Sequence, residues 1–215
     1  MNVKSNYFKL NKNDFDKYLN DLKHASNTIN LLDGKFFFNQ SIEIFNMLLV
    51  LNKKILELDF IINSFTNFLK KQIIQSFIID EIESTNKIEN IFSTKHDIFK
   101  IINESSLSKE KKIISIANAY KYLLENEGKY VKTCQDIRNI YDLVLNDTIE
   151  KNDLPDGIYF RHGDVYVTNG IKNIHIGIAG EENVNRLMEE FVNFYNSKND
   201  TLIKMILCHF MFEYI

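Results

Sequence analysis

Apolar side chains recur at helical spacing over the middle of the chain. Between residues 41 and 92 they stand three or four positions apart, as Ile42, Phe45 and Leu49 do, and this repeat is typical of one face of an α-helix. Asn52-Lys53 and Asn67 are the points at which the run can be divided into separate helices. The last part of the run predicts a helix over about 73–92.

The rest of the chain is also mostly helical in pattern. One amphipathic helix is expected within residues 1–35, which are otherwise polar, and the capping residues of segment 93–97 begin the next helix. A later helix opens at Glu181-Glu182, and the last one is capped by Asp200 or Thr201 and runs through Ile215. Further helices are predicted for residues 97–103, 108–126 and 133–147.

Residues 157–178 carry the one convincing β signal. Val165 and Val167 alternate with polar neighbours, Asn169-Gly170 can supply the two positive φ angles of a type I′ turn, and isoleucines alternate on the return strand. The pattern predicts a single β-hairpin in an otherwise mainly α fold. Because a lone hairpin is barely stable, we expect it to lie against helices or to present an edge to another molecule.

Composition narrows the class of protein. The 215 residues are 45% apolar and include 17 Phe, which is enough for one sizeable core, and a single Pro leaves few forced helix breaks. A net charge of −3 provides no basic face, so we expect no nucleic-acid partner. The N-terminal residues contain no apolar signal segment, and charged residues interrupt every long apolar stretch. We therefore expect a cytoplasmic protein without a membrane partner, and the many Ile, Lys and Asn residues are compatible with an AT-rich bacterial genome.

Common catalytic and metal-binding motifs are absent from the sequence. It contains no glycine-rich nucleotide loop, P-loop, nucleophile elbow or H-E-x-x-H pattern. Cys134 and Cys208 stand far apart and are expected to be reduced, and the five histidines lack metal-ligand spacing. No metal site and no catalytic residue is predicted.

Residues 81–94 place Thr85 and Glu89 four positions apart, on one face of a helix, with Asn90 next. This stretch resembles the inhibitory helix of the Fic family, whose signature is [S/T]-x-x-x-E-[G/N], and the string TNKIEN matches it in full. The resemblance implies that the Glu89 carboxylate pairs with an arginine of the family's catalytic loop, in the place of the ATP γ-phosphate, because a carboxylate imitates the bidentate fit of a phosphate. Thr85 would help to fix the helix, and Asn90 would let it pack closely.

Two further stretches follow in the family's order. GIYFRHGDVYVTNG, which begins at Gly157, resembles the β-hairpin flap that receives the target segment. HFMFEYI, residues 209–215, resembles the end of the helix that leads into the catalytic loop H-P-F-x-[D/E]-G-N-G-R-x-x-R. The resemblance covers about residues 75–215, and the chain ends one residue before the position of the loop histidine. His209 lies within the helix and lacks the glycine and arginine neighbours of that loop, so we do not identify it as the loop histidine.

Fic enzymes transfer AMP from ATP to a hydroxyl side chain of a target protein. The resemblance therefore implies ATP and Mg²⁺ as cofactors of intact members and an unknown target protein as the partner. None of the loop residues is in this sequence, so we expect no productive ATP binding and no AMP transfer by the chain as given. The flap residues that would line the target or nucleotide groove are Asp164, Val165, Tyr166, Val167, Thr168, Asn169 and Gly170.

The resemblance divides the chain into two regions. Residues 1–92 are expected to form a helical region that ends with the inhibitory helix of 73–92. Residues 93–215 are expected to form a Fic-type bundle with its flap at about 158–178 and its C-terminal core helices missing. The alternative is a non-catalytic helical module that binds or regulates another protein.

The last helix is also expected to leave apolar side chains uncovered. Such a patch predicts lower stability or homo-oligomerisation through this helix. The side chains concerned are Ile206, Leu207, Phe210, Phe212 and Ile215.

Overall fold

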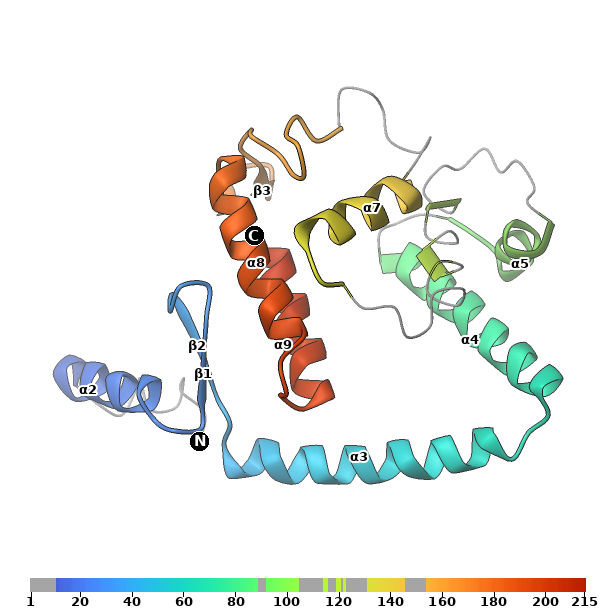
Figure 1. Ribbon diagram of the computed structural model, residues 1–215, viewed down its shortest axis with the longest axis horizontal. Coiled ribbons are helices and arrows are strands. Elements are labelled where there is room, and N and C mark those ends of the chain that lie inside the picture. The colour runs from blue at the N-terminus through green and yellow to red at the C-terminus, as the bar shows by residue number, and fades with distance from the viewer. Residues whose placement is uncertain are drawn as a thin grey trace. The chain divides into compact units, whose positions relative to one another are not determined.

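The computed structural model describes residues 11–88, 92–104, 114–115, 119–120, 122, 131–145 and 154–215. These residues are mainly helical with two short antiparallel hairpins (Figure 1), which confirms the predicted mainly α fold class. The chain divides into two compact units, residues 1–61 with 198–215, and residues 62–197. The predicted division at residue 92 falls inside the second unit and stays a prediction.

The first unit begins with the amphipathic helix expected within residues 1–35. Helix α2 (Lys12–Lys23) starts at Asn11, whose side-chain oxygen accepts a hydrogen bond from the backbone N–H of Asp14 at 3.0 Å. It is followed by a hairpin that the sequence pattern did not predict, formed by β1 (Thr28–Leu31) and β2 (Phe36–Asn39).

The first hairpin packs against the last helix, α9 (Thr201–Tyr214). The ring of Phe36 contacts the rings of Phe210 and Tyr214 edge-on, with centroids 5.2 Å and 4.7 Å apart. The start of α9 is fixed by Asp200, whose carboxylate accepts from the N–H of Leu202 at 2.9 Å, which confirms a predicted cap. Residues distant in the sequence thus form one layer of the first unit.

The prediction of an uncovered α9 is wrong for two of its five side chains. Leu207 and Ile215 are buried, because they continue the series that begins at Ile203 and passes through Met211, four residues apart on one side of the helix. The exposed ones are Ile206, Phe210 and Phe212.

Helix α3 (Ile42–Asn63) is continuous, so Asn52-Lys53 does not divide it. The side-chain amide of Asn52 donates to the carboxylate of Asp200 at 3.2 Å, which gives this mid-helix polar residue a partner within the first unit. The other expected division is confirmed, because α4 (Asn67–Ile88) begins there and its first turn is capped by the Thr66 hydroxyl.

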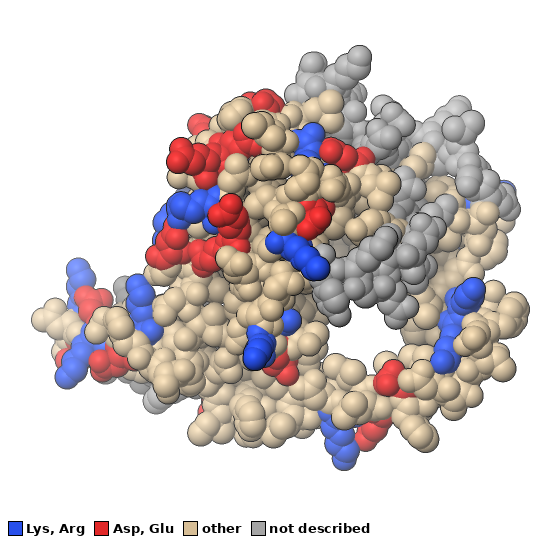
Figure 2. All heavy atoms as spheres, in the orientation of Figure 1, with Lys and Arg blue, Asp and Glu red and all other residues tan. Residues whose placement is uncertain are grey.

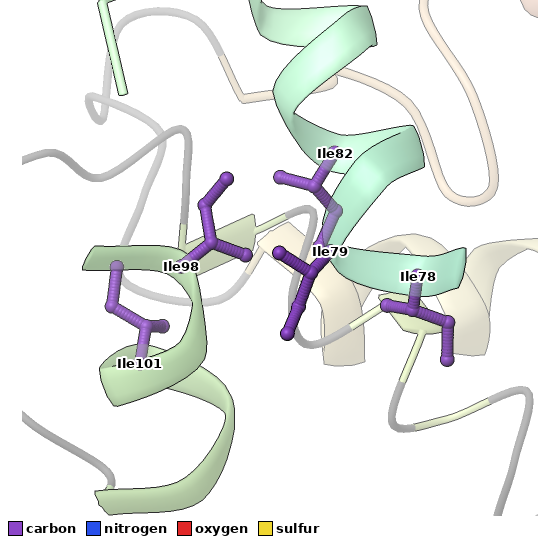
Figure 3. Close-up of a cluster of buried hydrophobic side chains, with 5 residues drawn as sticks. All are labelled: Ile78, Ile79, Ile82, Ile98 and Ile101. Atoms are coloured by element: carbon purple, nitrogen blue, oxygen red, sulfur yellow. The ribbon is translucent and has the colours of Figure 1, made fainter. Parts of the chain in front are cut away.

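The second unit contains a core of five isoleucines. Ile79 and Ile82 of α4 lie against Ile98 and Ile101 of α5 (Lys95–Glu104), and Ile78 completes the cluster (Figure 3). Thr94 caps α5 through reciprocal hydrogen bonds with Asp97, as the sequence predicted.

The remaining elements of this unit are α7 (Cys134–Leu145), β3 (Tyr166–Thr168), β4 (Asn173–Ile176) and α8 (Glu181–Tyr195). Helices α7 and α8 pack together and confirm two predicted helices. Most of the helix predicted for 108–126 lies outside the described residues. No helix within the described ranges is long and apolar enough to cross a membrane.

The loop between β1 and β2 combines backbone strain with deep burial. Leu32 and Asp33 have φ angles of 54° and 56°, and Gly34 follows at 72°. A positive φ is unfavourable for a leucine, yet the Leu32 side chain is fully buried. Burial of this side chain therefore holds the loop in its strained conformation.

We expect Leu32→Ala to lower the free energy of urea unfolding by about 2–5 kcal/mol, because it removes buried methyl groups and leaves the strain in place. Leu58, which is 55% exposed on α3, supplies the matched control, and Leu58→Ala should change the same quantity by less than about 0.5 kcal/mol. Equal effects of the two substitutions would show that Leu32 does not anchor the hairpin.

Candidate functional site

The predicted flap is a short two-stranded hairpin. Its antiparallel register places Tyr166 opposite Ile176 and Val167 opposite His175, with an irregularity after Val167. The N–H of Gly177 donates to the carbonyl of Val165 at 2.9 Å, which extends the pairing by one position. The sequence prediction of a hairpin here is confirmed.

The turn of this hairpin differs from the predicted type I′ turn. Four residues, 169–172, separate the paired strands, and Gly170 alone among them has a positive φ, of 85°. The Asn169 side chain accepts hydrogen bonds from the N–H groups of Ile171 and Lys172, both at 3.0 Å. Asn169 therefore holds the loop through its side chain and does not need the left-handed backbone of a two-residue turn.

Both faces of the flap hairpin are open. Val165 and Val167 on one side and Tyr166 on the other are 44–56% exposed, and Ile174 and Ile176 of the return strand are exposed to a similar degree. Asp164 is exposed as well and accepts a hydrogen bond from the Tyr166 hydroxyl at 2.9 Å, which raises the pKa of that hydroxyl. Thr168 hydrogen-bonds within the turn. A hairpin with so little cover depends on its attachment to the helices.

That attachment centres on the buried carboxylate of Glu181, in the first turn of α8. One carboxylate oxygen accepts hydrogen bonds from the N–H groups of Tyr159 at 2.6 Å and Phe160 at 3.1 Å. The other lies 3.5 Å from the ring of His162. The N–H of Tyr159, followed by that of Phe160, holds the pKa of Glu181 below its ordinary value of 4.5. Sequence analysis had treated Glu181 only as the start of a helix.

Gly157 makes the close approach of Glu181 possible. A β-carbon at Gly157 would lie 2.6 Å from the Glu181 carboxyl carbon and 2.6 Å from the Phe160 carbonyl oxygen. The N–H of Gly157 also donates to that carbonyl at 3.0 Å, which closes a tight turn around the carboxylate. Any larger residue would displace this turn or Glu181.

Other side chains hold the same loop. Arg138 of α7 donates to the carbonyl of Tyr159 at 3.3 Å, and its Nε donates to Asp142 at 2.8 Å. Asp156 accepts from the N–H of His162 at 2.6 Å, which lowers the pKa of Asp156. The chain that enters the flap is thus bound to α7, to α8 and to itself.

The predicted inhibitory segment lies at the end of α4. Thr85 is half-buried on this helix, next to Asn86, which is completely buried and donates to the Ser93 hydroxyl at 2.8 Å. Glu89 and Asn90 lie outside the described residues, so their assignment stays a prediction. Helix α4 makes its main contacts with α5, whereas the flap loop is bound to α7 and α8.

An open cleft of about 370 Å³ lies along α4, close to Thr85 in the sequence. Burial, and then the charge of Glu81, raise the pKa of Tyr120 in its wall. Asp80 in the same wall is already paired with Lys95 at 2.6 Å. Sequence analysis singled out none of these residues. The lining residues are Phe77, Ile78, Asp80, Glu81, Ser84 and Tyr120.

No group of three or more His, Cys, Asp or Glu side chains that could hold a metal ion occurs within the described part of the chain. Cys134 and Cys208 are buried free thiols, and burial raises the pKa of both. Comparisons of the chain with protein-family models, with curated proteins and with solved structures returned no match.

We expect Glu181→Gln to loosen the flap, because glutamine lacks the charge that strengthens the hydrogen bonds from Tyr159 and Phe160. Hydrogen exchange followed by mass spectrometry should show faster exchange over residues 156–176 and unchanged exchange over 95–104. Glu182→Gln, at the exposed neighbouring position, is the matched control.

The hydrogen bonds from Tyr159 and Phe160 to Glu181 also predict that the protection of this loop from hydrogen exchange depends on pH. Because folding lowers the pKa of Glu181, its stabilising contribution is present above pH 4.5 and is lost as the pH falls below 4.5 towards the lowered value. The wild-type loop should therefore lose protection over this range. Glu181→Gln should show a smaller step, which the Asp156 carboxylate contributes at lower pH because its pKa is lowered in the same loop. An identical acid step in both proteins would contradict the role of Glu181.

Proposed function

We propose that this chain supplies the target-docking hairpin and the inhibitory helix of a Fic-type AMP-transferring system, and that it transfers no AMP by itself. The observation that carries the proposal is the exposed hairpin at 166–176, held by a buried carboxylate at the start of a helix. Its support from the sequence is the string TNKIEN, whose first four residues lie at the end of α4, and the string HFMFEYI, which begins at His209 on α9. The two strings occur in the family's order.

Backbone groups at the outer edge of the flap support docking by strand addition. In an antiparallel ladder, hydrogen-bonded and non-hydrogen-bonded pairs alternate. Val165 is hydrogen-bonded to Gly177, so Tyr166, opposite Ile176, turns its N–H and C=O away from the partner strand. An extended target segment can pair with such an edge, while Tyr166 and Val167 supply side-chain contacts.

The residues of this chain do not fit the Mg²⁺–ATP that the family uses. The sequence has no H-P-F-x-[D/E]-G-N-G-R run, and no cluster of metal ligands occurs among the residues that the structure describes. We propose a regulatory and target-binding role for these 215 residues in such a system, and a cytoplasmic location.

The alternative proposal is a protein-binding module that is unrelated to AMP transfer. The same exposed hairpin favours it, because an edge strand binds an extended segment whatever chemistry follows. The two proposals are distinguished by the role of Glu89. It is an inhibitory residue in the Fic-type proposal and has no role in the alternative.

We expect Glu89→Gly to raise AMP transfer in a chain extended beyond Ile215 by the catalytic loop and following helices of an active Fic enzyme. Loss of one charge-assisted contact to an arginine corresponds to an increase of about 10- to 100-fold in the rate of AMP transfer. Labelling with [α-³²P]ATP measures this rate. Glu83→Gly replaces a carboxylate on α4 by glycine, and it should leave the rate of AMP transfer low. Equal rates in the two variants would favour the alternative.

The flap is tested in the activated, extended chain by Tyr166→Pro. Proline removes the outward N–H without removing a bond between β3 and β4, and Tyr166→Ala removes the same side chain but keeps the N–H. We expect labelling of proteins in a cell extract to be about 2- to 10-fold weaker with proline than with alanine, the equivalent of one backbone hydrogen bond. Self-labelling should be the same in both. Equal labelling of extract proteins would exclude strand addition at this edge.

A further inference from the structure

The turn of the flap hairpin contains the pair Asn169-Gly170, and both residues are exposed. An asparagine followed by glycine loses its side-chain amide most readily, because glycine has no β-carbon to hinder attack by its backbone nitrogen. Asn169-Gly170 is the one such pair in the sequence. The site also has room for a new ring, since no described atom outside the chain neighbours of Gly170 lies within 4 Å of the position that its β-carbon would take.

The turn holds the Asn169 side chain by its carbonyl oxygen. The backbone N–H groups of Ile171 and Lys172 both donate to Oδ1 at 3.0 Å. Attack at the side-chain carbonyl carbon would place negative charge on this oxygen, and N–H donors at about 2.7–3.1 Å stabilise such an oxyanion. The amide nitrogen Nδ2, which would leave as ammonia, has no hydrogen-bond partner among the residues that the structure describes. The contacts of the folded turn therefore favour the reaction.

Asn196 at the end of α8 shows the opposite arrangement. It is also exposed and is followed by a small residue, but its Nδ2 donates to the carbonyls of Val131 and Val192, both at 2.8 Å. The N–H of Ser197 donates to the carbonyl of Phe194 at 3.0 Å, so the nitrogen that would attack is fixed in the last turn of the helix. Loss of ammonia from Asn196 would break two hydrogen bonds. This asparagine supplies an internal comparison.

We propose that Asn169-Gly170 is a self-modification site, at which the folded turn converts asparagine into aspartate and isoaspartate. The Gly170 nitrogen forms a bond to Cγ of Asn169 while the bond from Cγ to Nδ2 breaks. The amide leaves as ammonia with the proton of the Gly170 N–H, and a five-membered succinimide remains. Water then cleaves the ring at Cγ to give aspartate, or at the main-chain carbonyl to give isoaspartate, whose backbone is one carbon longer. The site does not depend on the Fic resemblance.

The two products differ in their effect on the hairpin. Aspartate at position 169 keeps a side-chain oxygen in the place where Oδ1 accepts from Ile171 and Lys172. Isoaspartate lengthens the backbone of the turn and moves the carboxylate. It also displaces the Asn169 N–H, which donates to the Lys172 carbonyl at 3.3 Å and closes the turn. Isoaspartate should therefore loosen the flap, whereas aspartate should not.

Both products also add one negative charge to an acidic part of the second unit. Asp and Glu side chains gather over α8 in Figure 2, and the exposed Asp164 lies at the start of the hairpin. An effect of charge must therefore be separated from an effect of the longer backbone. Asn169→Asp adds the charge alone and is the matched control.

The role of the turn is tested by following the full chain in mildly alkaline buffer at physiological temperature, folded or unfolded in guanidinium chloride. Mass spectrometry of the tryptic peptide 162–172, in which Asn169 is the only asparagine, measures conversion. Asn169 should convert at least as fast in the folded chain as in the unfolded chain. Asn196, assigned by fragmentation of peptide 187–198, should convert at least about 10-fold more slowly when folded. Slower conversion of Asn169 in the folded chain, or no protection of Asn196, would overturn the proposed role of the turn contacts.

Hydrogen exchange tests the effect on the flap. The fraction of aged chain that contains isoaspartate should exchange about 2- to 10-fold faster over residues 165–177 than fresh chain, as expected for the loss of one hydrogen bond. Asn169→Asp should exchange as fresh wild-type chain does. Unchanged exchange in the isoaspartate fraction would contradict the loosening, and equally fast exchange in Asn169→Asp would assign it to charge and not to the longer backbone.

Discussion

The flap depends on one buried carboxylate. Glu181 lies where a helix begins, where unpaired backbone N–H groups and the helix dipole favour negative charge. One of its oxygens accepts hydrogen bonds from two N–H groups of a neighbouring loop, and so the loop is bound to the helix by charge-assisted hydrogen bonds. A two-stranded hairpin with both faces open has too little apolar burial to order itself. The hydrogen bonds from Tyr159 and Phe160 to Glu181 therefore keep the hairpin ordered. Glycine is required at position 157 because a β-carbon there would lie 2.6 Å from the Glu181 carboxyl carbon.

In the first unit, the main feature is the burial of one side of the strongly apolar helix α9. Side chains spaced by four residues on α9 are buried, and the β1–β2 hairpin adds Phe36 to the aromatic residues near the end of that helix. The strained loop at Leu32 shows how much burial contributes, because its left-handed backbone is retained with a leucine side chain in the interior. Burial of the Leu32 side chain thus outweighs a local conformational penalty.

Sequence periodicity predicted most helices, because their apolar repeats and caps are local signals. The Asp200 cap and the start of α4 at Asn67 are examples. It did not predict β1 and β2, since strands of four residues with three consecutive phenylalanines show no alternation, although Asp33-Gly34 was a usable turn signal. The sequence pattern also did not predict the hydrogen bonds from Tyr159 and Phe160 to Glu181. These residues lie 22 and 21 positions before Glu181, and their donors are backbone N–H groups, which no side-chain pattern encodes. The role of Glu89 rests on a motif alone.

Two exposed apolar surfaces among the described residues, the hairpin at 166–176 and helix α3, differ in the groups that they present. The flap offers backbone hydrogen-bonding groups along an edge, and these pair with any extended segment, so specificity falls to a few side chains such as Tyr166. Helix α3 offers no free backbone groups, because its own ladder uses them, and it can bind only through the shape and spacing of its side chains. The described part of the chain therefore presents two different chemistries at its surface, one of backbone hydrogen-bonding groups and one of side chains alone.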